Sequence, residues 1–424
     1  MESITIAGSR DRFERRGRPW FYLADTVWSA FTNATTDEWK EYLGFRRQQG
    51  FNALQINILP QWDRSRGSEP FEPFARKGKD GWDFSSPNPR YFERARRMSE
   101  MAAEEGLLSA LVLLWCDYVP GTWGAEMVPG HAITAEEVAP YVRYVAEAFK
   151  GLSPVYLVSG DTRFTAPETT DIYRRALALI KAHAPESPTT LHLAPDAELP
   201  DDLINADELD FYMFQSGHHI EQQERAYRLA ESFSSLPVKR PVVNGEPCYE
   251  GIGYFQRYGR FSAGQVRRSV WQSLLSGAKA GVSYGCHGLW SWHRTDMSFG
   301  PLGFWDPPYP WSTALRLPGA WDAAFSRWVF ETFDLFDLEP KQQQVVSETP
   351  EIRLAAASNQ GKVAVYVPAA TTLRLRSELS GCECILIDLS ERRILHPVLH
   401  ARGEETTVEL PPVNGDYLFL ALRR

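Results

Sequence analysis

Two carboxylic acids stand at the ends of apolar segments of the sequence. Asp161 follows the run PVYLVSG (154–160), and Glu246 ends the run PVVNGE (241–246). Small residues precede each acid, so its side chain would leave a buried strand on a tight turn. Cleavage of a glycosidic bond needs two carboxyl groups, about 5 Å apart for retention of configuration and farther apart for inversion. The pair therefore indicates glycoside hydrolysis, although one such acid alone is more often a structural carboxylate or a helix cap.

Further polar and aromatic residues fall at the ends of the other apolar segments. Amides, imidazoles and hydroxyls suit a ligand that carries many hydroxyl groups, and indole rings suit the C–H faces of sugars. For Asp25 a structural role, as a helix cap or inside the fold, is the stronger alternative. The residues that we expect to bind substrate are Asp25, Trp28, Gln55, Asn57, Trp115, Gln215, His218, Tyr284, His287, Trp290 and Trp292.

The segments that would position these residues alternate in character up to about residue 333. Nearly continuous apolar runs are typical of strands covered on both faces. Such runs occupy residues 21–24, 51–59, 107–115, 154–160, 189–194, 209–217, 241–246 and 281–287. Helices with capping signals are expected at 36–49, 89–105, 134–150 and 263–280. The helix between the fifth and sixth strands is weak, with only 199–206 available.

This alternation predicts an α/β fold, a (β/α)8 TIM barrel, whose active site lies at the C-terminal ends of the strands. An open doubly wound sheet is the competing architecture. It would show a glycine-rich phosphate loop after an early strand, and the sequence has none. The segment 4–20, with a turn near Arg16-Gly17, is expected to form a hairpin that closes the barrel floor.

The period of the apolar residues changes to two from about residue 340. Short alternating runs separated by turns predict a small C-terminal antiparallel β-sandwich. All 14 Trp lie between Trp20 and Trp328, so the two parts also differ in composition. We therefore expect a barrel domain with its N-terminal hairpin at 1–335 and a β-sandwich domain at 336–424. The simpler role for the β-sandwich domain is to stabilise the barrel, because a carbohydrate-binding module would more often display exposed aromatic residues, and this domain contains no Trp.

Composition and charge exclude several classes of protein. The chain has 424 residues, of which 43% are hydrophobic and 23% charged, as in ordinary folded proteins. Its net charge of -9 argues against nucleic acid or an anionic membrane as a partner. No apolar run approaches the roughly 20 residues that span a bilayer. The N-terminus lacks the apolar core of a secretory signal, and the five cysteines are few and scattered, so we expect a cytoplasmic protein with reduced thiols.

Other hydrolytic chemistries find little support in the sequence. No HxH or HExxH motif supplies a zinc site, and the adjacent His218 and His219 would usually point apart. The GxSxG motif of a serine nucleophile is also absent. We therefore expect neither a metal nor a cofactor, although histidines distant in sequence could still assemble a metal site in space.

Five motifs, in order, resemble those of one family. Residues 17–28 (GRPWFYLADTVW) resemble the opening G-x-P-F-F-x-L-G-D-T-x-W of the apiosidase-like glycoside hydrolases. The segments that are similar to the family's later motifs are 50–55 (GFNALQ), 215–218 (QSGH), 245–250 (GEPCYE) and 280–285 (AGVSYG). The resemblance spans most of residues 13–330, and a small β domain behind the barrel agrees with it.

The resemblance implies a barrel hydrolase related to a large clan of retaining enzymes, with the catalytic pair at Asp161 and Glu246. The family's named substrate is apiose in plant pectin side chains. Two departures stand out: Ala24 replaces the usual Gly of the opening motif, and Asp161 stands where the wider clan has Asn-Glu. Because Asp is one methylene shorter than Glu, the separation of the carboxyls, and with it retention or inversion, stays open.

The leading hypothesis is an exo-acting, retaining glycosidase for a carbohydrate substrate, with Glu246 as nucleophile and Asp161 as general acid/base. It would remove a terminal sugar, apiose or another furanose or small pyranose, from a glycoside or oligosaccharide. A catalytically silent sugar-binding protein on a hydrolase scaffold is the alternative, and a metal-dependent hydrolase that uses the histidines is the third. The sequence leaves the sugar, its linkage and the oligomeric state open.

Overall fold

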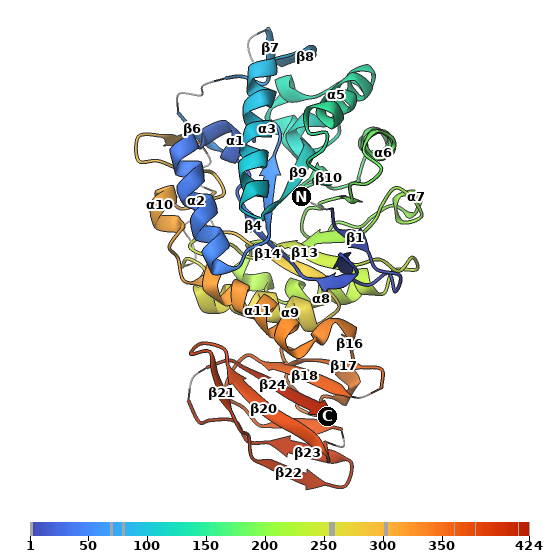
Figure 1. Cartoon of the computed structure of the whole chain (residues 1–424), viewed down its shortest axis with the longest axis vertical. Helices are drawn as coiled ribbons and strands as arrows, with labels where there is room; N and C mark the ends of the chain where they lie inside the picture. The colour runs from blue at the N-terminus through green and yellow to red at the C-terminus, as the bar shows by residue number, and fades with distance from the viewer. Residues whose placement is uncertain are drawn as a thin grey trace.

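The computed structural model consists of a barrel followed by two antiparallel sheets (Figure 1). It describes residues 3–67, 71–78, 81–253, 259–300, 304–359, 361–377, 379–413 and 415–423. No helix in these ranges combines the length and the apolar content needed to cross a bilayer.

The barrel is an eight-stranded parallel sheet in the order β11-β10-β9-β5-β4-β14-β13-β12. A parallel bridge between His192 and Met213 joins its two ends and closes the ring. The prediction of a (β/α)8 barrel is confirmed. The strands are β4 (Tyr22–Thr26), β5 (Ala53–Asn57), β9 (Leu108–Trp115), β10 (Val155–Gly160), β11 (Thr189–Thr190), β12 (Tyr212–Gln215), β13 (Val242–Glu246) and β14 (Gly281–Tyr284).

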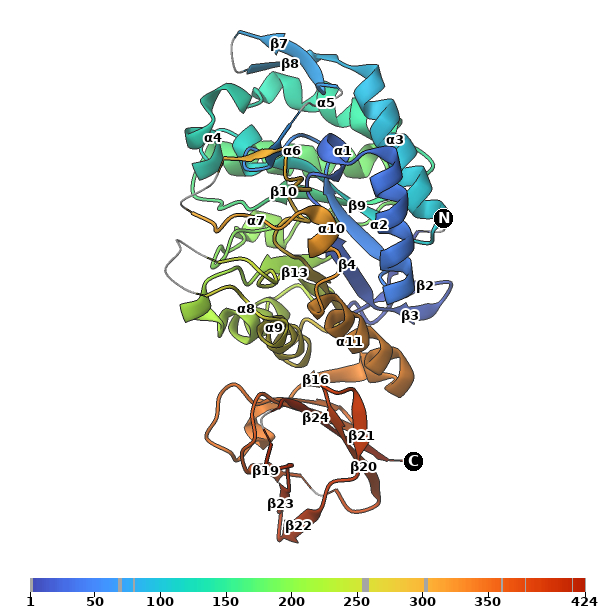
Figure 2. The same cartoon turned by 90° about the vertical axis from the view of Figure 1, so that its left-hand side faces the viewer.

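Helices follow the strands and cover the outside of the ring (Figure 2). Helix α2 begins and ends at capping signals of the sequence: Thr35 and Glu38 form a reciprocal capping box, and the helix ends at Gly50 with a φ of 93°. The main helices are α2 (Thr36–Gln49), α3 (Pro89–Glu104), α5 (Ala135–Ala148), α6 (Pro167–His183), α7 (Asp201–Ile204), α8 (Arg225–Ser234), α9 (Ala263–Leu275) and α11 (Gly319–Phe333).

Two of the expected helices are shorter than their predicted spans by four residues or more. The weak helix at 199–206 is the single turn α7, which begins after Pro200. Helix α9 was expected to reach residue 280 but ends at Leu275, because Gly277 adopts a φ of 123° and turns the chain. The sequence signal at Gly281 therefore marks the start of β14 and not the end of the helix.

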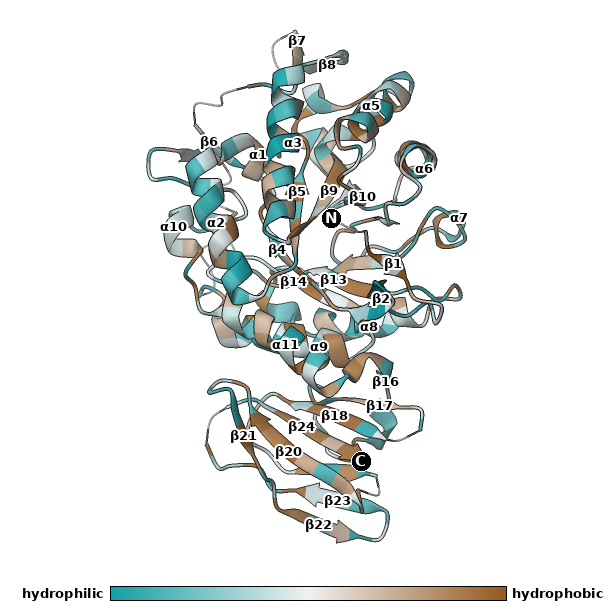
Figure 3. Cartoon of the chain, viewed as in Figure 1, coloured by the Kyte–Doolittle hydropathy of each residue, from teal (hydrophilic) through white to brown (hydrophobic). Residues whose placement is uncertain are grey.

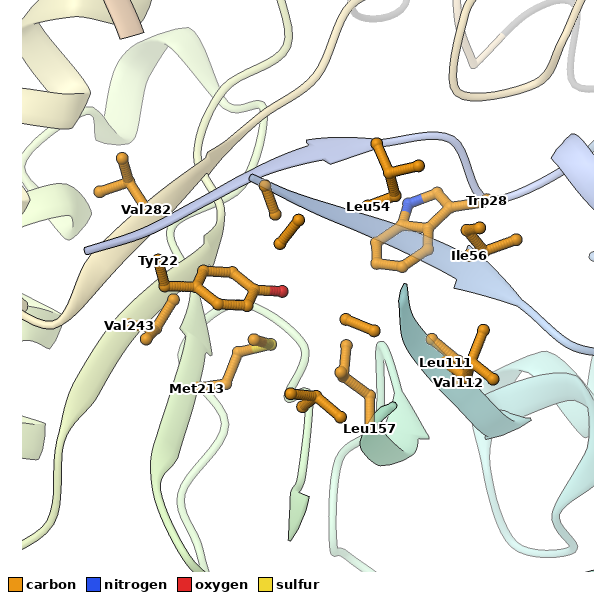
Figure 4. Close-up of a cluster of buried hydrophobic side chains, with 14 of the residues drawn as sticks. Tyr22, Trp28, Leu54, Ile56, Leu111, Val112, Leu157, Met213, Val243 and Val282 are labelled. Carbon is orange, nitrogen blue, oxygen red and sulfur yellow. The ribbon is translucent and has the colours of Figure 1, made fainter. Parts of the chain in front are cut away.

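The interior and the floor of the barrel are apolar. Figure 4 shows buried side chains from strands around the ring, with the Tyr22 ring among them. The segment before β4 forms the three short antiparallel strands β1 (Thr5–Ile6), β2 (Phe13–Arg15) and β3 (Arg18–Trp20), and the hairpin turn lies at Arg16-Gly17 as expected. Phe13 of this sheet packs on Tyr22 and on Phe211, at the N-terminal ends of β4 and β12.

The C-terminal part is a sandwich of two antiparallel sheets, as predicted. Apolar side chains from both sheets meet in one buried cluster that includes Leu354, Val365, Leu375, Val408 and Phe419. The larger sheet contains β16 (Leu338–Pro340), β17 (Arg353–Ala357), β18 (Lys362–Val367), β20 (Cys382–Asp388), β21 (Arg393–Leu395) and β24 (Tyr417–Arg423). The smaller contains β19 (Leu373–Arg376), β22 (Leu399–Arg402) and β23 (Glu405–Val408).

The other face of the larger sheet packs on the barrel. Tyr366, Ile387 and Leu418 belong to the same buried cluster as the barrel core. Figure 3 shows β18, β20 and β24, in which hydrophobic residues are frequent, beside helices α9 and α11 on the outer side of the barrel. The division of the chain into domains at 335/336 stays a prediction.

Candidate active site

A cavity of about 270 Å³ lies at the C-terminal ends of the barrel strands. Seven of the residues predicted from the sequence line it: Asp161, Glu246, Trp28, Trp115, Gln215, His218 and Trp290. Barrel enzymes carry their active sites at this end, so we refer to this cavity as the pocket.

Glu246, the last residue of β13, is held by two imidazoles. His218 Nε2 lies 2.9 Å from Glu246 Oε1 in a hydrogen bond. His192 Nε2 lies 3.2 Å from Glu246 Oε2, close enough for an ion pair but outside hydrogen-bond geometry. Burial alone would raise the pKa of Glu246, but the contacts with His192 and His218 outweigh it and lower the pKa to about 2. Glu246 is therefore ionised at neutral pH.

Backbone amides fix the tautomers of both imidazoles. The amide of Asp161 donates to His192 Nδ1 at 3.2 Å, and the amide of Tyr249 donates to His218 Nδ1 at 3.2 Å. An N–H group can only donate, so each Nδ1 must be the acceptor and each ring proton sits on Nε2. Both Nε2–H groups then face the carboxylate of Glu246.

A local irregularity of β13 directs Glu246 into the pocket. The register between β12 and β13 shifts at this point: Phe214 pairs with Asn244, whereas Gln215 pairs with Glu246. Such a bulge breaks the strict alternation of side chains. Gly245 is the extra residue, and a Cβ there would lie 2.4 Å from the side chain of Met213.

Asp161 follows β10 and sits in a different environment from Glu246. Its backbone has a φ of 48°, a left-handed conformation that is uncommon for residues other than glycine. The Trp123 indole donates to the carbonyl of Asp161 at 3.0 Å and helps to hold this turn. Burial, followed by the charge of Glu246, raises the pKa of Asp161 to about 7. Its carboxyl group is therefore largely protonated below neutrality.

Several buried polar atoms of the pocket wall have no hydrogen-bond partner among the residues that the structure describes. They are Trp62 Nε1, Asp63 Oδ1, Trp115 Nε1, Gln215 Oε1 and Glu246 Oε2. Buried polar groups are nearly always paired in folded proteins. Indole donors next to carboxyl and amide oxygens match the hydroxyl groups of a sugar.

Asp25 and Tyr284 were expected to bind substrate, but the structure places both outside the pocket. Asp25 is fully buried, receives a hydrogen bond from Tyr42 at 2.7 Å and pairs with Arg46 at 2.6 Å. Tyr284 donates to Glu250 at 2.7 Å. The two residues are partners in the register of β4 and β14, so their side chains leave the barrel on the same, helix-facing side.

The structure also does not bring Gln55, Asn57, His287 and Trp292 to the pocket lining. Gln55 lies inside the barrel and donates to the carbonyl of Gly245 at 2.8 Å, which supports the strand that carries Glu246. Asn57 donates to Gln61, itself a lining residue, at 3.1 Å.

His287 and Trp292 are both completely buried. His287 lies 2.6 Å from the carbonyl of Asp306, and burial lowers its pKa to about 3. Trp292 stacks on Trp311 and donates to Glu38 at 3.1 Å. Both therefore serve the packing of the loops above the barrel.

Sequence reasoning missed a large part of the pocket wall. His192 lies in the predicted fifth strand (189–194) and was not among the expected site residues, although it contacts Glu246. The other missed residues come mainly from loops, where no periodic pattern marks them. They are Gln61, Trp62, Asp63, Trp123, Met127, Pro195, His219, Tyr249, Ile252, Phe304 and Trp305. The excess of Trp before residue 329 was the one available signal.

Other acids near strand ends are engaged elsewhere. Asp117 pairs with His131 at 3.0 Å, Asp196 with Arg225 and Arg228, and Glu250 accepts from Tyr284. Among the described residues, no three His, Cys, Asp or Glu side chains gather in a way that could hold a metal ion.

Comparison with known proteins identifies the family of this chain. Residues 9–337 match the family described as "Apiosidase-like, catalytic domain". The chain belongs to this apiosidase-like family. It is a glycosidase, and the pocket lies within the matched segment. No curated protein matches the chain.

Solved structures share the fold over the whole chain. One described as "Glycoside hydrolase" is 19% identical, with a TM-score of 0.81, and the match covers 100% of this chain and 97% of the other. A glycoside hydrolase family 5 protein from Bacteroides vulgatus is 20% identical, with a TM-score of 0.81 and coverage of 99% and 93%. At this level of identity the likeness establishes the shared architecture of barrel and sandwich.

Proposed function

We propose that this apiosidase-like protein is an exo-acting, retaining glycosidase in which Glu246 is the nucleophile and Asp161 the general acid/base. The observation that carries the proposal is the opposite protonation of the two carboxyls in one pocket. The pKa of Glu246 is lowered to about 2 and that of Asp161 is raised to about 7. Enzymes that cleave glycosides need one ionised and one protonated carboxyl at the same pH.

The reaction follows from these protonation states. Glu246 attacks the anomeric carbon while Asp161 gives its proton to the departing glycosidic oxygen, so a glycosyl-enzyme ester forms and the alcohol leaves. Asp161, now ionised, then takes a proton from water as that water attacks the anomeric carbon and releases the sugar. The amide of Asp161 keeps the proton of His192 on Nε2, so the same residue also helps to hold Glu246 ionised.

Exo action is supported by the size and chemistry of the pocket. Its volume of about 270 Å³ lies just below the range of roughly 300–1,000 Å³ typical of small-molecule sites. Trp28, Trp115 and Trp290 supply apolar faces for a sugar ring. A terminal furanose such as apiose, or a small pyranose, is the substrate class that we infer.

A panel of aryl glycofuranosides and glycopyranosides tests the activity itself. The purified protein should release the phenol from at least one of them, with apiofuranosides included in the panel. Sugar binding in a calorimeter without any release, at high enzyme concentration and long times, would favour a catalytically silent sugar-binding protein instead.

Two variants test the roles of the acids on the glycoside that the panel identifies. Glu246→Gln should abolish turnover of natural and activated substrates alike, because without a nucleophile no glycosyl-enzyme forms. Asp161→Asn should slow natural glycosides by about 10²- to 10⁴-fold. On a dinitrophenyl glycoside, whose leaving group needs no proton, it should instead give a burst of phenol, and azide should accelerate the slow phase. If Asp161→Asn is as inactive as Glu246→Gln on that substrate, and azide changes nothing, the roles are wrongly assigned.

A further inference from the structure

A third carboxyl lines the pocket beside Asp161 and Glu246. Asp63 lies in the loop after β5 and is 9% exposed. Its Oδ1 has no hydrogen-bond partner among the described residues. The proposed reaction uses only Asp161 and Glu246, so Asp63 is a buried polar group of the site without a role in the chemistry.

The loop that carries Asp63 is fixed by side chains from the surrounding elements. At the start of the loop 58–65, Tyr91 donates to the Ile58 carbonyl at 2.6 Å and Tyr118 to the Pro60 carbonyl at 2.7 Å. Asn57 donates to the side chain of Gln61 at 3.1 Å. At the end of the loop, Asn33 donates to the carbonyl of Ser65 at 2.8 Å. The loop is therefore anchored at both ends. Asp63 is held in the wall before any ligand arrives, as a recognition group must be.

The surroundings of Asp63 favour the neutral form of its carboxyl. Burial, and then the neighbouring acids Asp117, Asp161 and Glu246, raise the pKa of Asp63 well above its usual value. No Lys or Arg occurs among the described residues that line the pocket. A protonated carboxyl donates through its O–H and accepts at its other oxygen, which suits a hydroxyl group of a ligand. An anionic group on the ligand would meet acids without a compensating cation.

We propose that Asp63 is a specificity-determining residue that binds one hydroxyl of the sugar in the pocket, and that this sugar carries no anionic group at that position. The inference rests on the proposed glycosidase function. In this account Asp63 selects the substrate, whereas Asp161 and Glu246 perform the chemistry.

Monodeoxy analogues of the aryl glycoside found by the panel test this proposal. Asp63→Ala should lower kcat/KM for the parent glycoside by about 10- to 100-fold, which is 1.4–2.8 kcal/mol of transition-state binding. For the one analogue that lacks the bound hydroxyl, wild type and Asp63→Ala should have equal kcat/KM, because the contact is already missing. Asp63→Asn, whose amide can also donate and accept, should recover a large part of the loss on the parent.

Asp388→Asn provides the control, because Asp388 is a buried carboxyl at the end of β20 in the sandwich and does not line the pocket. It should change kcat/KM for the parent and for every analogue by one common factor. The proposal is overturned if Asp63→Ala also acts by one common factor on the parent and all analogues, or has no effect on any. Turnover of the parent by wild type reports separately on the proposed function. If wild type turns over no glycoside, the same comparison is made on calorimetric binding of the free sugar and its deoxy analogues.

Discussion

At the scale of single residues, the site depends on two carboxyls that differ in what surrounds them. Both Asp161 and Glu246 line the pocket, and burial disfavours the charged form of each. The imidazole Nε2–H groups of His192 and His218 face Glu246, and they outweigh the effect of burial on its pKa. Within the described part of the chain, His192 and Arg163 lower the pKa of Asp161 only by their charge, and their effect is smaller than those of burial and of the charge of Glu246, which raise it. One pocket thus holds a base and an acid at the same pH.

The two pKa values predict the pH dependence of kcat/KM. The proposed mechanism requires ionised Glu246 and protonated Asp161, so kcat/KM should fall as the pH drops through about 2 and as it rises through about 7. The profile should be bell-shaped with its optimum on the acid side of neutrality. A rate that keeps rising past about pH 9 would point to another base.

His218 sets the acid limb of that profile. Removal of its Nε2–H in His218→Ala takes away a hydrogen bond to a charged group, which contributes about 1.5–3 kcal/mol. The pKa of Glu246 should therefore rise by about 1–2 units, and the acid limb should move up by the same amount while the alkaline limb stays near 7. An acid limb that does not move would show that His218 does not hold Glu246 ionised.

The sequence was informative for Asp161 and Glu246 because each follows an apolar strand. It was less informative about the side from which a residue leaves a strand. Asp25 and Tyr284 also lie at the C-terminal ends of strands. They face each other in the pairing of β4 and β14, and their side chains point away from the pocket, toward Arg46 and the helices. Asp63 could not be found this way, because a loop has no period that links one residue to the pocket.

At the scale of elements, glycines next to the two acids allow side chains to approach the strands closely. The ring of Trp115 lies so near Gly160 that a Cβ there would be 2.0 Å from one of its carbons. Trp115 lines the pocket, and Gly160 precedes Asp161. The glycine therefore couples the position of an aromatic wall to that of the acid.

Gly160→Ala should displace the Trp115 ring and disturb Asp161. We expect a loss of about 1–3 kcal/mol of stability from overpacking. The kcat/KM of this variant should also be clearly lower than that of wild type on the same glycoside. Gly44→Ala is the control, since nothing lies within 4 Å of a Cβ in that helical position of α2. It should gain about 0.5–1 kcal/mol and keep full activity. Equal behaviour of the two variants in thermal unfolding and kinetics would contradict this account.

The elements themselves were largely predictable from apolar runs and caps. Helices α6, α8 and α11 were not among those expected, and the fifth strand, expected at 189–194, is reduced to Thr189–Thr190 followed by isolated bridges at His192 and Leu193. The apolar pattern does not report where backbone pairing becomes irregular. Here the irregular end allows His192 to accept from the amide of Asp161 and to face Glu246.

At the scale of the whole molecule, the β-sandwich is tied to the barrel by buried charge as well as by apolar contact. Arg267 of α9 donates to Asp416, just before β24, through both Nε and Nη2, and to Asp322 of α11 through Nη1 at 2.7 Å. The side chains of Asp416 and Asp322 are each 6% exposed. Loss of one partner would leave Arg267 with a poorly compensated charge.

Asp416→Ala should therefore lower the stability of the protein by about 3–5 kcal/mol, the usual cost of breaking a buried pair. The expected observation is a fall in Tm by several degrees. Glu147→Ala, which removes an exposed ion pair with Lys150, should change Tm little. If both variants have the same Tm as wild type, the contact between the sandwich and the barrel does not contribute to stability.

The central claim is that Glu246 forms a covalent bond to the sugar, and mass spectrometry of the intact protein tests it most directly. A 2-deoxy-2-fluoro dinitrophenyl glycoside of the sugar found by the panel should glycosylate the enzyme quickly, with release of dinitrophenolate, and the bound fluoro sugar should then hydrolyse slowly. The account predicts a mass increase of one fluoroglycosyl group, located by peptide mapping on Glu246 and absent from Glu246→Gln. An adduct on another residue would contradict it, as would steady release of fluoro sugar of inverted configuration with no adduct at any time.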